Sequence, residues 1–355
     1  MYFRIIVVLL CAQLCGIIGI QNADAANKKS DEITAQSSRS AAMVTFLEAY
    51  ARSPEAFDNA TLESYQEILG TFNNAKFIVR DDFVQETYFQ ACSSLFEHTA
   101  RRPEAADTLA EMLSRASGTA VNYLQLKPKG QTARMEAVGS LIEGIARNPD
   151  DNATLADLAQ LFCPPASALG KVREIAACAR MEAVAALFEG IARQPAAADM
   201  MIYYSLLYLG EYDTSKKPGA ALSAARLSTI ATGCESIARQ PEAAEDILSA
   251  ARLLCGPALA SDRYKPEVMK AYMQAVGGML DAVMRQPEAI DAITGFFDEL
   301  TGRPQDNPPK GPAIQSFALE AIGPLTLAVT RNPDMKTQLE TLFTDYTGCP
   351  INAGE

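Results

Sequence analysis

The chain has 355 residues, and its 31 Lys and Arg against 43 Asp and Glu give a formal net charge of −12. This acidity argues against a nucleic-acid-binding protein, which usually carries a basic patch or a basic overall balance. A single histidine, His98, excludes multi-histidine metal sites and disfavours histidine-dependent catalytic triads. We therefore expect no nucleic acid, no metal and no cofactor.

The first 25 residues are typical of a secretory signal peptide. Residues 1–4 carry one positive charge, an apolar run follows over residues 5–20, and Ala23 and Ala25 supply an A-x-A cleavage motif. An uncleaved membrane anchor is the alternative, but this run is shorter than the ~20 residues that a spanning helix needs. We expect cleavage before Ala26, export to a periplasm or to the cell exterior, and no stable membrane span in the mature chain.

An Arg-x-Pro motif, usually followed by Glu or Asp, recurs along the rest of the chain. Its arginines are 49 residues apart once and 46 residues apart five times: Arg52, Arg101, Arg147, Arg193, Arg239, Arg285 and Arg331. A fixed period of this size is the signature of a tandem repeat protein. We expect a flexible spacer over residues 26–38, one repeat domain over 39–346 and a C-terminal tail over 347–355.

Two helices are expected in each unit. Upstream of the arginine, apolar residues recur in steps of three and four, which predicts an amphipathic helix. Examples are Met181, Val184, Phe188 and Ile191, and in the last unit Leu319, Ile322, Thr326 and Val329. Proline ends this helix, and a second, shorter helix is expected to begin at the proline. Because neither helix can bury its apolar stripe alone, adjacent hairpins must stack.

The segment from Arg180 to Pro195, with the short helix expected after it, resembles the HEAT/armadillo class of α-solenoids, especially the bacterial HEAT-like repeats. The resemblance is one of architecture and covers residues 39–346. It implies an all-α, right-handed solenoid of about seven stacked hairpins with a 46-residue period. It also implies that the helix ending at the Arg-x-Pro corner faces the concave side. This class has no shared active site.

An acidic residue stands four positions before the motif arginine in six of the seven units, which is the favourable order for an ion pair on a helix. The pairs are Glu48–Arg52, Glu97–Arg101, Glu143–Arg147, Glu189–Arg193, Glu235–Arg239 and Asp281–Arg285. In the last unit Leu327 replaces the acid before Arg331. These residues are either solvated pairs or a ladder that sets one repeat on the next.

The short helix of the fourth unit is unusually apolar, with Tyr203 and Tyr204 near its middle. Tyr204, Tyr208 and Tyr212 would lie on one stripe if the helix persisted that far. Exposed tyrosines are favoured at protein interfaces. A helix packed on both sides would show the same composition, so both interpretations stay open.

The variable loops at the edge opposite the Arg-x-Pro corners carry basic residues, among them Lys127, Lys129, Lys216 and Lys217. A row of cations could meet an anionic surface or an acidic partner. The alternative is that these loops are hydrophilic only because they are exposed.

Cys163 and Cys178 lie at similar distances from their flanking proline corners, ~21–26 Å at the helical rise per residue. Both would then be at the loop edge, so we predict a disulfide between them.

The chain has no P-loop, dinucleotide-binding glycine motif, G-x-S-x-G motif, EF-hand loop or C-x-x-C motif. We therefore expect an exported, non-catalytic binding scaffold that engages a protein partner through its concave face or its loop edge. The alternative is a solenoid-based enzyme or small-molecule binder that uses carboxylates in its groove. A catalytic site should break the repeat with unique polar residues, whereas the local departures here are apolar or lie in loops.

Overall fold

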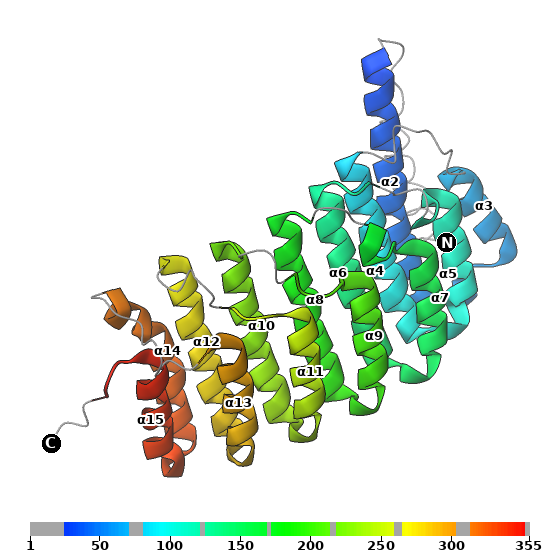
Figure 1. Ribbon diagram of the computed structural model, residues 1–355. Helices are drawn as coiled ribbons and strands as arrows, with labels where there is room; N and C mark the ends of the chain where they lie inside the picture. Colours follow the sequence, from blue (N-terminus) through cyan, green and yellow to red (C-terminus); the bar gives the residue numbers. More distant parts are fainter. Residues whose placement is uncertain are drawn as a thin grey trace.

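The computed structural model describes residues 25–70, 81–120, 125–168, 172–213, 218–258, 265–302 and 313–351. The signal peptide predicted for residues 1–25 lies outside this part of the chain, apart from Ala25. In the described residues the regular elements are helices, and a long α-helix, a 3₁₀ turn and a short α-helix alternate (Figure 1). The long helices are α2 (Ala25–Arg52), α4 (Asp82–Arg101), α6 (Pro128–Arg147), α8 (Glu174–Arg193), α10 (Ala220–Arg239), α12 (Pro266–Arg285) and α14 (Ala313–Arg331). The short helices are α3 (Asn59–Leu69), α5 (Ala106–Ser117), α7 (Asn152–Phe162), α9 (Ala198–Leu209), α11 (Ala244–Leu254), α13 (Ile290–Thr301) and α15 (Lys336–Thr347).

Each long helix ends at the arginine of an Arg-x-Pro motif, as predicted. The proline does not begin the short α-helix directly. It opens a 3₁₀ turn, such as Pro241–Ala243, and α11 begins only at Ala244. Gln240, with φ −142° and ψ 81°, reverses the chain because proline forces the residue before it out of the helical region.

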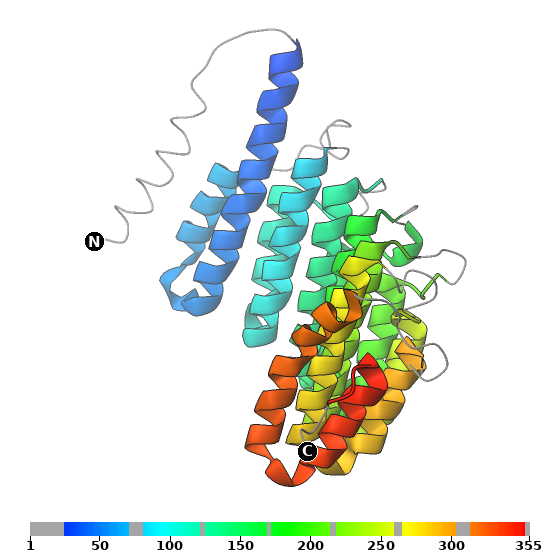
Figure 2. The same cartoon turned by 90° about the vertical axis from the view of Figure 1, so that its left-hand side faces the viewer.

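The helices form two layers, which are visible in two perpendicular views (Figures 1 and 2). Consecutive long helices pack side by side from α2 to α14 and make the first layer. Each short helix from α5 onward contacts its own long helix and the preceding long helix, so that α9, for example, contacts both α6 and α8. The short helices therefore cover the groove between two neighbouring long helices and tie adjacent units together.

The apolar stripe of each interior long helix is buried between these layers. Met181, Val184, Phe188 and Ile191 are all at most 1% exposed. They belong to one continuous apolar core that runs along the array. This arrangement meets the requirement that neither helix of a hairpin is stable without its neighbours.

Helix α2 begins earlier than the sequence pattern predicts. It covers residues 26–38, which were expected to be a flexible spacer. Its side chains also reach α5: Gln36 Nε2 donates to the carbonyl oxygen of Ala116 (3.1 Å), and the hydroxyls of Ser40 and Ser117 are 3.1 Å apart. These contacts are polar, which explains why a search for apolar periodicity does not find them.

Three arginines lie inside the core, although arginine is almost never fully buried without partners. Arg134 on α6, Arg180 on α8 and Arg226 on α10 are 0%, 8% and 4% exposed. They are separated by 46 residues each and occupy the same place in successive long helices.

Their partners are backbone carbonyl groups at and just after the C-terminal ends of short helices. The last carbonyl groups of a helix have no N–H donor within that helix, so they need a partner from elsewhere. Arg180 donates from Nε to Leu209 (3.0 Å), from Nη2 to Gly210 (2.6 Å) and from Nη1 to Leu254 (2.6 Å). It thereby joins the C-terminal ends of α9 and α11. Burial lowers the pKa of Arg180 to about 10, so the guanidinium remains charged at neutral pH and suits the negative ends of both helices.

Tyrosine takes the same position in the units on either side of the three arginines. The hydroxyl of Tyr88 donates to the carbonyl of Phe162 (3.0 Å), and that of Tyr272 donates to the carbonyl of Tyr346 (3.1 Å). Each of these bonds spans 74 residues, as does the bond from Arg180 to Leu254. Buried side-chain donors therefore link α4, α6, α8 and α12 each to the short helix of the following unit.

Candidate functional site

A row of exposed leucines crosses the layer of short helices. Leu161 on α7, Leu207 on α9 and Leu253 on α11 occupy the same position in three successive units and are 43%, 39% and 36% exposed. The same position holds Arg115 in the unit before this row and Glu299 in the unit after it. The apolar row is therefore confined to the middle of the array and ends at charged residues on both sides.

Tyr203 adds an aromatic side chain to this row. It lies one helical turn before Leu207 on α9 and is 60% exposed, and its ring packs edge-on against Tyr204 with 5.2 Å between centroids. The same position holds Asp157 on α7 and Ser249 on α11. Leu161, Tyr203, Leu207 and Leu253 are called the short-helix apolar surface below.

The exposed stripe of α9 contains Tyr203 and Leu207, each one residue before the predicted positions Tyr204 and Tyr208. Helix α9 ends at Leu209, and Gly210, with φ +74°, directs the chain away before Tyr212. Tyr208 is 2% exposed and belongs to the core, where burial raises the pKa of its hydroxyl. The outward positions are those of Tyr203 and Leu207, which the sequence could not reveal because α9 is apolar on all its faces.

Tyr212 has a structural role beyond the end of α9. Its ring lies 4.4 Å from the guanidinium carbon of Arg226, measured to the ring centroid. Its amide donates to the carbonyl of Leu253 (2.9 Å). Tyr212 is therefore a cover over a buried arginine, and Tyr203 and Tyr204 remain as the candidate binding tyrosines of this segment.

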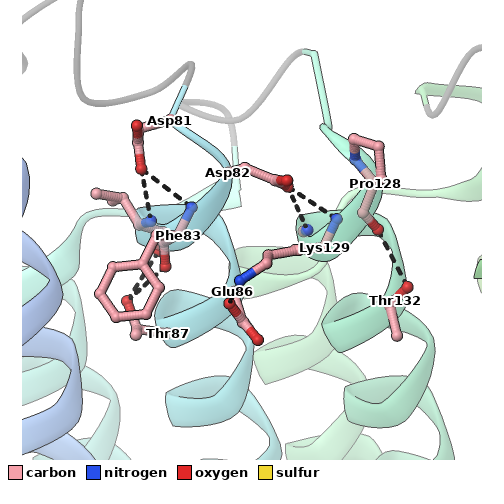
Figure 3. Close-up of polar contacts among 10 residues, drawn as sticks. Asp81, Asp82, Phe83, Glu86, Thr87, Pro128, Lys129 and Thr132 are labelled. Carbon is pink, nitrogen blue, oxygen red and sulfur yellow. Dashed lines mark hydrogen bonds and ion pairs between the residues drawn. The ribbon is translucent and has the colours of Figure 1, made fainter.

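Two residues of the predicted basic edge, Lys127 and Lys129, lie at the start of α6 and make local contacts there. Lys127 donates its amide to Gln85 Oε1 (2.8 Å) and leaves its side chain exposed. The ammonium of Lys129 lies 3.1 Å from the Glu86 carboxylate and 5.7 Å from the centroid of the Phe83 ring (Figure 3). Its positive charge is thus balanced within the same edge.

Asp82 explains why Lys129 lies there. The Asp82 carboxylate, at the start of α4, accepts hydrogen bonds from the amides of Lys129 (2.8 Å) and Gly130 (3.2 Å) in the first turn of α6 (Figure 3). A neighbouring helix thereby caps α6, whose own Lys127 provides no side-chain cap. Lys216 and Lys217 lie outside the described residues.

The acid–arginine pairs are mostly confined to one helix. Pairs form between Glu48 and Arg52, Glu97 and Arg101, Glu235 and Arg239, and Asp281 and Arg285. Both members are solvated in most of them, so each contributes ~0.2–0.5 kcal/mol. One pair crosses between units: Arg331, whose own helix has Leu327 in place of the acid, lies 3.5 Å from the Asp281 carboxylate.

The predicted Cys163–Cys178 disulfide is wrong, because both cysteines are free. Cys163 follows α7 and is 1% exposed in the core. Cys178 is partly exposed on α8, where burial and three neighbouring glutamates raise its pKa. The prediction compared positions along the helix axes and ignored the direction in which each side chain leaves its helix.

The described carboxylates of the long-helix layer do not gather into a metal site. The pKa of Glu136 is raised by burial, and secondarily by Glu182 and Glu86. In the described part of the chain, no three or more His, Cys, Asp and Glu side chains are placed to hold a metal ion.

Neither the leucine row nor the buried arginines are among the sequence-based candidates. Both could have been found by aligning the units at 46 residues and asking which positions depart from their neighbours, rather than by searching for known motifs.

No protein family, curated protein or solved structure matches this chain. None of the described helices combines the length and apolar character needed to cross a membrane.

Proposed function

We propose that the protein is an exported, non-catalytic scaffold that binds a protein partner through the short-helix apolar surface. The observation that carries this proposal is the row of Leu161, Leu207 and Leu253 with Tyr203, exposed in three adjacent units of an otherwise acidic chain. Clustered exposed apolar residues with a polar rim mark interaction sites, and tyrosine is enriched in such sites. The array would be a right-handed, HEAT-like solenoid of about seven hairpins with a 46-residue period.

The composition of this surface suggests the partner's chemistry. Three leucines and a tyrosine, on short helices that adjoin along the array, fit a partner that offers an apolar stripe, such as one face of an amphipathic helix. The charged ends of the row, Arg115 and Glu299, would limit the length of that stripe. Export is supported by the N-terminal pattern of residues 1–25.

The test is a capture experiment from the envelope or secreted fraction of the native source, with two matched baits. Leu207→Glu introduces a charge in the short-helix apolar surface, whereas Ile175→Glu introduces the same charge at a 69% exposed residue of the long-helix layer. We expect one specific protein to be retained by the wild-type and Ile175→Glu baits and lost with Leu207→Glu. Loss with Ile175→Glu alone would place the site on the long helices and contradict the proposal.

Native mass spectrometry of the purified protein tests the alternative of a small-molecule binder or enzyme. A tightly bound small ligand, together with no specific protein in any capture, would favour that alternative.

A further inference from the structure

The last long helix, α14, presents an uncharged and partly apolar face that nothing in the described part of the chain covers. Its exposed positions over residues 316–330 are Ser316, Leu319, Ile322, Gly323, Thr326, Leu327 and Thr330. This set is called the α14 end face below. It is ~21 Å long at the helical rise per residue and has no charge, although the whole chain has a formal net charge of −12.

Two apolar positions of the α14 end face, those of Leu319 and Ile322, are buried by stacking in the interior units. Met273 and Val276 on α12 are fully buried, and their counterparts 46 residues later are Leu319 and Ile322, which are 62% and 42% exposed. The difference arises because α14 packs against α12, whereas no further long helix packs against α14 in the described residues.

Two glycines at the same position give an independent measure of this difference. A Cβ atom placed on Gly277 of α12 would lie 2.8 Å from Pro324 Cγ on the neighbouring helix. A Cβ placed on Gly323 of α14 would meet nothing within 4 Å. The positions of Leu319, Ile322 and Gly323 thus pack against a neighbouring helix on α12 but not on α14.

Leu327 makes this end more apolar than the repeat requires. The interior units hold Glu or Asp at this position, for example Asp281, whereas Leu327 is a leucine that is 56% exposed. A solenoid face that is not stacked is ordinarily polar. Here the substitution is in the opposite direction.

We propose that the α14 end face is a homodimer interface, in which two copies of the chain pair through α14 about a two-fold axis. A two-fold interface is self-complementary and is the commonest arrangement of homo-oligomers. A second α14 would bring Leu319, Ile322 and Leu327 against the same three residues without opposing like charges.

At the other end of the array, the described side chains of α2 do not form a matching surface. Exposed residues on α2 include Thr34, Ala41 and Thr45, which are small or polar. In the first hairpin the aromatic residues instead pack against one another. The ring centroid of Phe46 lies 5.6 Å from that of Phe57 and 5.4 Å from that of Tyr65. This contrast favours pairing of two C-terminal ends over a head-to-tail chain.

The test is the molar mass in solution of the protein purified after expression of residues 1–355. By sedimentation over a range of concentrations we expect a dimer for wild type. Ile322→Glu should raise the dimer dissociation constant at least ~100-fold. In a two-fold interface each copy contributes one glutamate, so two like charges are buried close together. Ile68→Glu, the same change at a 61% exposed residue of α3, should leave the dimer intact.

A cysteine variant tests the two-fold geometry directly. Thr326→Cys should form a covalent dimer under mild oxidation, and Thr341→Cys, at an exposed residue of α15, should not. A wild-type monomer at all concentrations would overturn the proposal. Larger open assemblies, or a dimer insensitive to Ile322→Glu, would overturn it as well.

Discussion

Arg180 donates a 2.6 Å hydrogen bond to the carbonyl oxygen of Leu254, 74 residues further along the chain. The same guanidinium also holds the carbonyls of Leu209 and Gly210, so one side chain on α8 binds the C-terminal ends of both α9 and α11. Arginine is suited to this position because it has five donors in a fixed planar arrangement and carries a charge that complements the helix ends. Unit-to-unit stacking thus depends on directed polar bonds as well as on apolar packing.

The first prediction concerns this arginine. Arg180→Met keeps much of the side-chain volume but leaves three buried carbonyl groups without their donor, so we expect the free energy of unfolding to fall by at least ~3 kcal/mol. Arg180→Lys should also be destabilising, because one ammonium cannot reach three separate acceptors. The control is Arg239→Met, at an exposed residue, which should change stability by at most ~0.5 kcal/mol. Urea-induced unfolding followed by circular dichroism measures these differences, and equal effects at the two positions would contradict the role of Arg180.

The second prediction concerns the cap that α4 provides for α6. Asp82→Ala removes the acceptor of the Lys129 and Gly130 amides and should lower the free energy of unfolding by ~1 kcal/mol. Asp82→Asn keeps an acceptor oxygen and should cost less. Hydrogen exchange of the Lys129 and Gly130 amides, read by mass spectrometry, should become faster in Asp82→Ala. Unchanged exchange there would show that the cap does not hold these amides.

The third prediction uses two helical glycines in different surroundings. A Cβ on Gly233 of α10 would overlap the Phe296 ring and approach Phe188 at 3.3 Å, so Gly233→Ala should destabilise the protein by ~1–3 kcal/mol. A Cβ on Gly295 of α13 meets nothing within 4 Å. Gly295→Ala should therefore stabilise the protein by ~0.5–1 kcal/mol, because alanine has the higher helix propensity. Thermal unfolding of the two variants should shift in opposite directions, and shifts of the same sign would contradict this description of the packing.

The fourth prediction concerns the cysteines. Alkylation of the native protein without reductant should label the partly exposed Cys178 and leave the buried Cys163 unmodified. After denaturation, still without reductant, both should be labelled, because neither is in a disulfide. Peptide mapping by mass spectrometry distinguishes these outcomes, and a Cys163–Cys178 linked peptide would contradict the structure.

The repeat made most of the fold predictable from the sequence. Seven Arg-x-Pro motifs at regular spacing placed the corners, and the apolar steps before each arginine identified the buried stripe of the long helices. The 46-residue period of the sequence shows which positions are equivalent, and equivalent positions in an array have equivalent surroundings. The same reasoning fails for α14, where Leu319 and Ile322 continue the stripe but are exposed, because no described helix covers them.

The candidate surfaces were less predictable, since they depend on direction around a helix. In α9 nearly every residue is apolar, so its composition could not distinguish the outward Tyr203 from the buried Tyr208. The Cys163–Cys178 prediction failed for the same reason. The buried arginines were missed because a charged residue within a helix pattern is ordinarily taken as exposed, and their acceptors lie as far as 74 residues away.

The last prediction concerns pH and the single histidine. His98 occupies a position that is small in the other units, for example Gly144 and Ala282, and it is 6% exposed. Burial lowers its pKa from 6.5, and the charges of Glu97, Arg101, Glu48 and Arg52 modify this effect. The folded protein therefore favours the neutral imidazole more than the unfolded chain does. As the pH falls through 6.5, the unfolded chain takes up the proton first, so the free energy of unfolding decreases.

His98→Ala removes this titrating imidazole and restores the small side chain of the neighbouring units. The variant should therefore lose less stability than wild type between about pH 7.5 and about pH 5. Urea midpoints of both proteins at the two pH values check this, and equal losses would show that other groups determine the acid sensitivity.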